Sequence, residues 1–177
     1  MLFRSLALTE SVLALLRELA SVLKALPEDI YTQPCGPTFS DATIGGHIRH
    51  SLDHLRALGD GVTTGLVAYD TRDRGTRIEC DRDAALNEVE RLLGVYGPMR
   101  VIMQELPLRL QIMPARDGQL ITLHSTLSRE LAFVLSHTIH HNATVRSMIA
   151  NRGVALPASF GYAPATLAFL ESSTCAR

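Results

Sequence analysis

The sequence has no run rich in lysine or arginine, and it has only three cysteines. Its 17 Lys and Arg residues against 18 Asp and Glu residues give a formal net charge of −1, so the basic surface that binds nucleic acid is missing. Cys35, Cys80 and Cys175 are far apart, and none belongs to a CxxC pair, which argues against a disulfide framework and a thiolate metal site. We therefore expect no nucleic-acid partner and a reducing, cytoplasmic location.

The chain also lacks an uncharged apolar run long enough to span a bilayer. Its most apolar stretch is residues 1–26. Four charged residues recur there at helical spacing among Leu and Val: Glu10, Arg17, Glu18 and Lys24. The stretch has no small-residue cleavage pattern of a signal peptide. We expect no membrane association and interpret the stretch as an amphipathic bundle helix that ends at Pro27.

The composition is ordinary for one globular domain, residues 1–177, with a sizeable core, because 46% of the residues are hydrophobic and 20% are charged. Apolar residues recur at intervals of three and four in three further segments. These predict long helices from near Ser40, Asp41 or Thr43 to Gly59 or Thr64, from Asp81 with a kink or stop at Gly97 and Pro98, and from about Ser125 to Asn151. Four long helices favour an all-α bundle.

The remaining segments are predicted to be connections. Residues 27–41 are rich in Pro, Gly and Asp, and residues 67–83 carry charges of mixed sign, so both are predicted to be loops. Alternating β-prone runs on either side of residues 114–118 (PARDG) predict a short β-hairpin before the last long helix. One short helix is expected to begin near Pro164.

Six of the seven histidines lie in two short segments, each within a predicted helix. They are His47, His50 and His54 in the first segment and His137, His140 and His141 in the second. Spacings of three, four and seven residues put side chains on one face of a helix. Neutral imidazole is a common ligand of zinc, nickel and iron, so two such faces that oppose each other can bind a metal ion.

The pattern excludes two familiar kinds of metal site. It is not the HExxH of metalloproteases, because Thr138 follows His137 and no glutamate lies between His137 and His141. It also lacks the Glu and Glu-x-x-His pairs of di-iron bundles, although Glu130 lies seven residues before His137 on the same face. One ion is therefore favoured over two. A single isolated histidine is more often a core residue than a ligand, but the clustering favours a site.

A His-bearing second helix, a long interval and a final helix with HxxxH together resemble the DinB/YfiT superfamily of four-helix metalloproteins. The resemblance extends from the first helix to about Tyr162. It implies a DinB/YfiT-like four-helix bundle in which His50, His137 and His141 bind one divalent ion, with open positions for water. His47 and His54 flank His50 by about one helical turn, so either is an alternative first ligand.

Members of this superfamily include thiol-dependent S-transferases and a thiol-dependent isomerase. The resemblance therefore implies a metal-dependent transfer of a small-molecule thiol to an electrophile, with zinc, nickel or iron(II) as the ion. Two other functions stay open at this point. The chain is alternatively a non-catalytic metal-binding or stress-response module, or a helical interaction scaffold without metal.

Several further residues are candidates for supporting roles. Asp53 and Glu130 either orient ligand histidines by accepting their second N–H or are solvated helix residues. His140 is a possible additional ligand. Three residues of the charged connection, Tyr69, Arg72 and Arg74, either grip an anionic substrate or belong to a solvated loop. A homodimer is plausible, because the first helix and the AFVL sequence of the last long helix can leave an apolar face uncovered.

Overall fold

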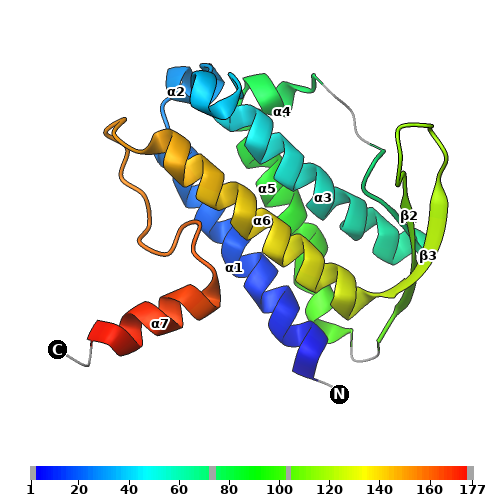
Figure 1. The fold of residues 1–177 in the computed structure, drawn as a ribbon. Coiled ribbons are helices and arrows are strands. Elements are labelled where there is room, and N and C mark those ends of the chain that lie inside the picture. Colours follow the sequence, from blue (N-terminus) through cyan, green and yellow to red (C-terminus); the bar gives the residue numbers. More distant parts are fainter. Residues whose placement is uncertain (1–2, 72–74, 103–104, 175–177) are drawn as a thin grey trace.

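Four long helices run side by side in the computed structural model, which describes residues 3–71, 75–102 and 105–174 (Figure 1). The long helices are α1 (Phe3–Ala25), α3 (Ile44–Thr64), α5 (Arg82–Tyr96) and α6 (Leu127–Ile149). The shorter elements are α2 (Glu28–Thr32), α4 (Arg77–Cys80), α7 (Pro164–Thr174), the 3₁₀ turns η1 (Pro37–Phe39) and η2 (Gly97–Val101), and the strands β1 (Leu66–Ala68), β2 (Pro107–Ile112) and β3 (Ile121–Thr126). The four long helices confirm the predicted helical architecture.

Side-chain caps fix where three of the long helices begin. Thr43 accepts a hydrogen bond from the backbone N–H of Gly46, and Asp81 accepts one from Ala84. Thr126 caps α6 in the same way. Each cap satisfies a backbone donor that the first turn leaves unpaired. The predicted starts at Thr43 and Asp81 are thus confirmed, and α5 stops at Tyr96, just before Gly97 and Pro98.

The bundle closes around a leucine-rich core. α1 packs against α5 and α6, and α3 packs against the same two helices, so each helix buries one apolar stripe between two neighbours. Leu16 and Leu23 of α1 and Leu52 and Leu55 of α3 are almost completely buried. Burial of each such side chain contributes about 1.5–3 kcal/mol. This packing holds α3 and α6, which carry the six clustered histidines, next to each other.

A small sheet joins the ends of α3 and α6. The strand order is β1-β2-β3, with β1 parallel to β2 and β2 antiparallel to β3. Leu108 and Leu110 of β2 turn toward the core and are buried. The predicted hairpin is confirmed, but β1 was missed. The molecule is therefore mostly helical with a three-stranded sheet, and all-α describes it only broadly.

Two segments predicted to be loops contain short helices. Residues 27–41 include α2 and η1, and residues 67–83 include the end of β1 and all of α4. The prediction of structureless connections was wrong there, because helices of one turn show no apolar periodicity in the sequence. α4 packs against α3 and α5, and the side chain of Tyr31 in α2 donates a hydrogen bond to the carbonyl oxygen of Ile78.

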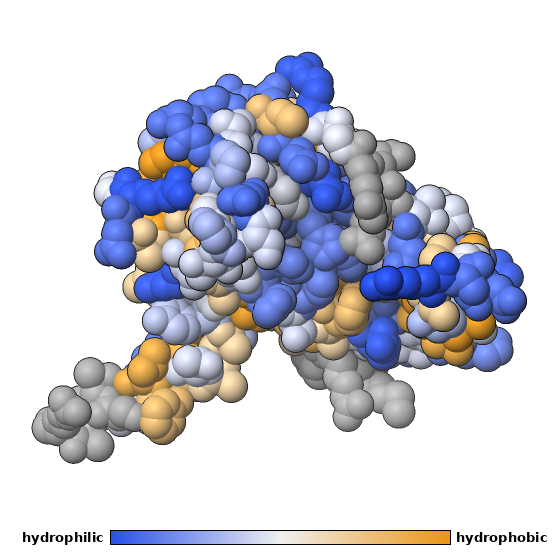
Figure 2. Space-filling view, turned by 45° about the horizontal axis from the view of Figure 1, so that its top comes forward, coloured by the Kyte–Doolittle hydropathy of each residue, from blue (hydrophilic) through white to orange (hydrophobic). Residues whose placement is uncertain are grey.

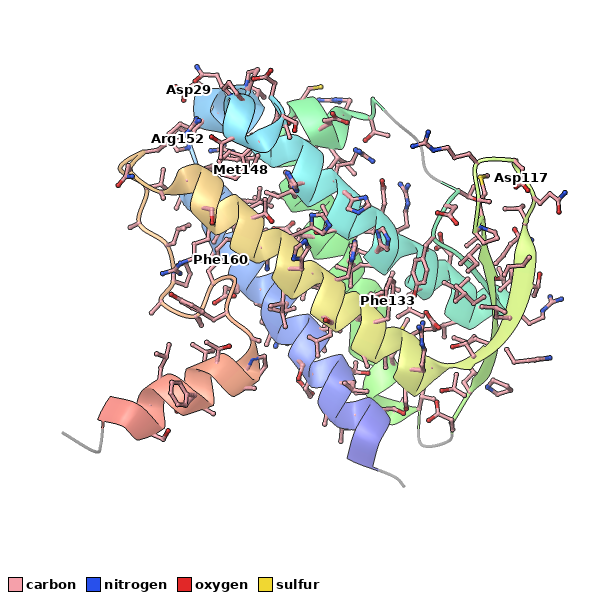
Figure 3. The ribbon with its side chains drawn as sticks, in the orientation of Figure 1. Asp29, Asp117, Phe133, Met148, Arg152 and Phe160 are labelled. Atoms are coloured by element: carbon pink, nitrogen blue, oxygen red, sulfur yellow. The ribbon has the colours of Figure 1, made fainter. Side chains whose placement is uncertain are left out.

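The segment after α6 folds back along that helix before α7 begins. Phe160 is fully buried (Figure 3), and Arg146 of α6 donates a hydrogen bond to its carbonyl oxygen. Gly161 has a φ of +78°, and a Cβ there would clash with the backbone of Ala143. α7, which starts at the predicted position, then projects from the bundle (Figure 1). Among the described residues, every helix is too short or too polar to cross a bilayer.

Three of the four tyrosines are buried, which predicts their behaviour in alkali. Burial raises the pKa of Tyr31, Tyr69 and Tyr96 well above the usual 10, with a further increase from the hydrogen bond of Tyr69 to Glu130. Because the folded pKa values are raised, their contribution to stability is complete below about pH 10 and is lost as the pH rises further.

We therefore expect the folded protein at about pH 11 to show much less tyrosinate absorbance than the protein in guanidinium. The measurement is a spectrophotometric titration of both states. Equal amplitudes in a protein that circular dichroism shows to be folded would contradict the burial of these rings.

Candidate metal centre

Two histidines of α3 and one of α6 bring their ring nitrogens together. The ligand atoms of His50, His54 and His137 all lie within 4.8 Å of one another. Nε2 of His50 is 3.1 Å from Nε2 of His137. Two nitrogens that each lie about 2.0–2.1 Å from one tetrahedral zinc ion are about 3.3 Å apart. The pair therefore has the separation that two ligands of one ion require, and the neutral nitrogen donors suit a divalent transition metal.

His141 is the fourth ring of the cluster. Its centroid lies 4.6 Å from that of His50 and 4.6 Å from that of His137, and the latter two are 5.0 Å apart. Its Nδ1 is 3.0 Å from Nδ1 of His47, so this second pair extends the cluster. The structure thus brings together the rings of the three histidines that the resemblance implies as ligands, and it also places His54 and His47 in contact with them.

Two triads contain both His50 and His137, and they rest on different distances. Nitrogen positions group His54 with His50 and His137. Ring positions form a nearly equilateral triangle when His141 is the third member, whereas the ring of His54 lies only 4.1 Å from that of His137 at an interplanar angle of 34°. His50 and His137 belong to both triads.

Burial keeps His47 and His141 uncharged at neutral pH. Burial, together with a smaller effect of the nearby His137 and His47, lowers the pKa of His141 to about 3. Burial and the neighbouring His140 also lower the pKa of His47. Both rings therefore have a lone pair at neutral pH, as a metal ligand must.

A backbone hydrogen bond sets the tautomer of His54. Its Nδ1 is 2.9 Å from the carbonyl oxygen of His50. Because a carbonyl oxygen only accepts, Nδ1 carries the proton and Nε2 keeps a lone pair. The ring is 5% exposed and stacks on Tyr69, with centroids 5.1 Å apart.

The inner wall of the cluster is an aromatic layer tied to a buried carboxylate. Phe133 lies on α6 (Figure 3), and its ring centroid is 5.0 Å from that of Tyr69 and 5.6 Å from that of His137. The hydroxyl of Tyr69 donates a 2.7 Å hydrogen bond to Glu130, which also accepts hydrogen bonds from Ser125 and Arg129. These donors satisfy a carboxylate that is 0% exposed.

Asp53 and Glu130 are both buried, so the alternative that they are solvated helix residues is wrong. Asp53 is 4% exposed and accepts hydrogen bonds from Arg49 and Arg56. The donors to Glu130 are a tyrosine, a serine and an arginine. Neither pattern is the carboxylate-to-histidine hydrogen bond that the sequence suggested. Glu130 acts on the cluster through Tyr69, which stacks on His54.

The other predicted residues have different outcomes. Tyr69 is 6% exposed, so it lies behind the histidines and not on a solvated loop. Arg72 and Arg74 lie outside the described residues. His140 is exposed, and its ring centroid is 5.3 Å from that of His141. Sequence reasoning missed Phe133, whose spacing of four residues before His137 placed it on the ligand face.

A pocket opens on one side of the cluster. Its volume is about 390 Å³, and it is lined by three histidines together with residues 41–43 just before α3, Gly46 and Arg49 of α3, and Glu79 of α4. The histidines are His47, His50 and His141. Arg49 and Glu79 form an ion pair at its wall, with Nε 3.0 Å from Oε2. An ion held by the histidines would thus have one side facing an open space and the other facing the aromatic layer.

No protein-family model and no solved structure matches this chain. The chain is similar to "FK506-binding protein 5" of Rhizopus delemar, with 32% identity over 107 residues. The match covers 60% of this chain and 28% of that protein. Because the chain spans only 28% of its relative, the similarity does not assign a family or an activity.

Proposed function

We propose that this chain is a DinB-like metalloprotein that binds one divalent ion, zinc, nickel or iron(II), and catalyses the transfer of a small-molecule thiol to an electrophile. The proposed ligands are His50 and His137, with His141 as the third. The resemblance in the order of helices and histidines supports the family, and the convergence of the imidazole nitrogens supports the metal.

The observation that carries a catalytic function is the pocket beside the histidines. Structural zinc sites are closed by protein ligands, whereas catalytic sites keep an open position for water or substrate. Here His50 and His141 line a pocket of about 390 Å³, which is within the usual size range of small-molecule sites. This favours an enzyme over a module whose ion only stabilises the bundle.

The histidines and the aromatic residues have different roles around the reacting thiol. A divalent ion, when bound, lowers the pKa of a thiol that reaches it. The neutral histidines hold such an ion without cancelling its charge, and the layer formed by Tyr69 and Phe133 keeps water from the inner side. In the transfer, the thiol loses its proton to solvent, its sulfur bonds to the electrophilic carbon, and the leaving group departs with the electron pair of the broken bond.

Binding of FK506 is not part of this proposal. The name of the Rhizopus delemar relative states that property for a protein of which the chain matches 28%. The converging histidine nitrogens and the pocket beside them instead support metal chemistry.

The proposal is tested with metal-loaded protein, a panel of cellular thiols and a chromogenic electrophile. We expect a thiol-dependent rate above that of the free ion, and we expect it to disappear in His50→Ala. His124→Ala is the matched control, because His124 is exposed on β3 and its loss should leave the rate unchanged. If the protein binds one ion per chain but no thiol is transferred faster than with the free ion, the protein is a metal-binding module and not an enzyme.

The third ligand is identified by comparing two single variants. Loss of groups that only support ligands costs about 10–100-fold in metal affinity, so loss of a ligand should cost more. We expect His141→Ala to weaken binding by more than about 100-fold and His54→Ala by less. Competition titration against a chromogenic chelator measures both. The reverse order would assign the third position to His54.

A further inference from the structure

The C-terminal helix α7 exposes large apolar side chains. Phe169 is 67% exposed and Leu170 is 46% exposed. Figures 1 and 2 both show the helix projecting from the bundle, and Figure 2 shows hydrophobic residues along the projection. From Pro164 to Leu170 the helix carries no charged residue. A helix that is apolar on most sides is normally buried.

A groove on the bundle begins where α7 begins. It has a volume of about 230 Å³ and lies between α1, α6 and the segment leading into α7. Ala14 and Leu15 of α1 and Leu135 and Ile139 of α6 line it. From its own molecule, α7 contributes only its first turn to the lining, through Pro164 and Leu167.

The exposed parts of α1 and α6 around this groove are small or apolar. Ala14 lines the groove and is exposed, as are Ala7 of α1 and Ala132 and Ser136 of α6, which lie within about one helical turn of lining residues on the same helices. Small side chains let another helix approach closely. Glu18, at one end of the groove, accepts a hydrogen bond from Ser159. The face is thus uncharged along most of its length, like the helix that projects beside it.

We propose that two copies of this chain form a homodimer in which each α7 packs into the α1/α6 groove of the other copy. Helix and groove are adjacent in one molecule, so a two-fold axis between two copies satisfies both apolar surfaces at once.

A dimer of this kind requires a minimum contact area from each α7. Eleven residues give α7 a length of about 16 Å, enough to follow the groove beyond its first turn. A stable interface buries about 1,600 Å² in total. Because the contact occurs twice, each helix in its groove must supply about 800 Å², and one aromatic side chain such as Phe169 supplies about 150–250 Å² of this. The buried Phe160 and the Arg146 hydrogen bond fix the direction in which α7 leaves.

The test is the mass in solution by light scattering coupled to size exclusion. The wild-type chain of 19.3 kDa is expected at twice that mass. Phe169→Asp and Ala14→Glu, each placed at an exposed position, should give monomers with unchanged helix content by circular dichroism. Leu120→Asp is the control, because Leu120 is 51% exposed on the hairpin loop and its change should leave the dimer intact.

A mixing experiment distinguishes exchange of α7 from other ways of pairing. A copy with Phe169→Asp retains its groove, and a copy with Ala14→Glu retains its helix. Their mixture keeps one complete helix–groove contact, so we expect a heterodimer that neither variant forms with itself. A wild-type monomer, a dimer that withstands both changes, or a dimer lost with Leu120→Asp would each overturn the proposal. Because the mixture keeps only one of the two contacts, it is measured at higher protein concentration, and a mixture that associates no more than either variant alone would also overturn it.

Discussion

Replacing His50 and His137 together by alanine is expected to reduce bound metal from about one equivalent to less than about a tenth. Their Nε2 atoms are 3.1 Å apart, and both residues belong to each of the two triads that the cluster allows. With both gone, His47 and His141 still place two nitrogens 3.0 Å apart across the two helices, but the group of three converging nitrogens loses two of its members. Plasma mass spectrometry on tag-free protein loaded with zinc, nickel or iron(II) measures the stoichiometry.

The free energy of unfolding gives a second test of the parent protein and the double variant. An ion that binds only the folded state stabilises it by about 2.7 kcal/mol at 100 times its dissociation constant. We expect this increase in urea unfolding experiments for the parent and for His124→Ala, and no increase for the double variant. A parent that binds none of the three metals would refute the metal centre and leave a helical scaffold.

Gly45→Ala is expected to destabilise the fold by about 3 kcal/mol, which is the upper part of the range for overpacking a core. Gly45 is buried in the first turn of α3, and a Cβ there would overlap the carbonyl oxygen of Glu79 and approach the ring of Tyr31. The main obstacle is the backbone of α4, so a change of rotamer does not relieve the clash. The result should be a lower urea midpoint.

Gly94→Ala is the matched control and should stabilise the fold. Gly94 lies in α5, is exposed, and has no atom near the position of a Cβ. Alanine at an exposed helical position is favoured over glycine by about 0.5–1 kcal/mol, so the midpoint should rise. A Gly45→Ala variant as stable as the parent would mean that α4 does not pack on the start of α3.

The long helices were predictable because each carries an apolar stripe and a recognisable end. Thr43 and Asp81 are capping residues, and Gly97 followed by Pro98 is a stop signal, so these boundaries are local properties of the sequence. β1 was not predictable in this way. Its three residues pair with β2 in parallel, about 40 residues further along the chain, and no local pattern encodes such a partner.

The candidate site was predictable only as far as helical spacing determines it. Spacing placed His50, His137 and His141 on faces that oppose each other once α3 packs on α6. It did not order the rings along the interface, and so it left the third ligand open. It also did not show that Tyr69 turns inward, because that orientation depends on β1 and on the buried carboxylate of Glu130.

The three-stranded sheet links the two histidine-bearing helices at one end. β1 follows α3 directly, β3 leads directly into α6, and β2 hydrogen-bonds to both strands. A displacement of the C-terminal end of α3 should therefore also displace the N-terminal end of α6. In hydrogen-exchange terms, the amides of β2 and of the adjoining turns of α3 and α6 would exchange as one cooperative unit. The spacing of the imidazoles therefore depends on this sheet as well as on the helical core.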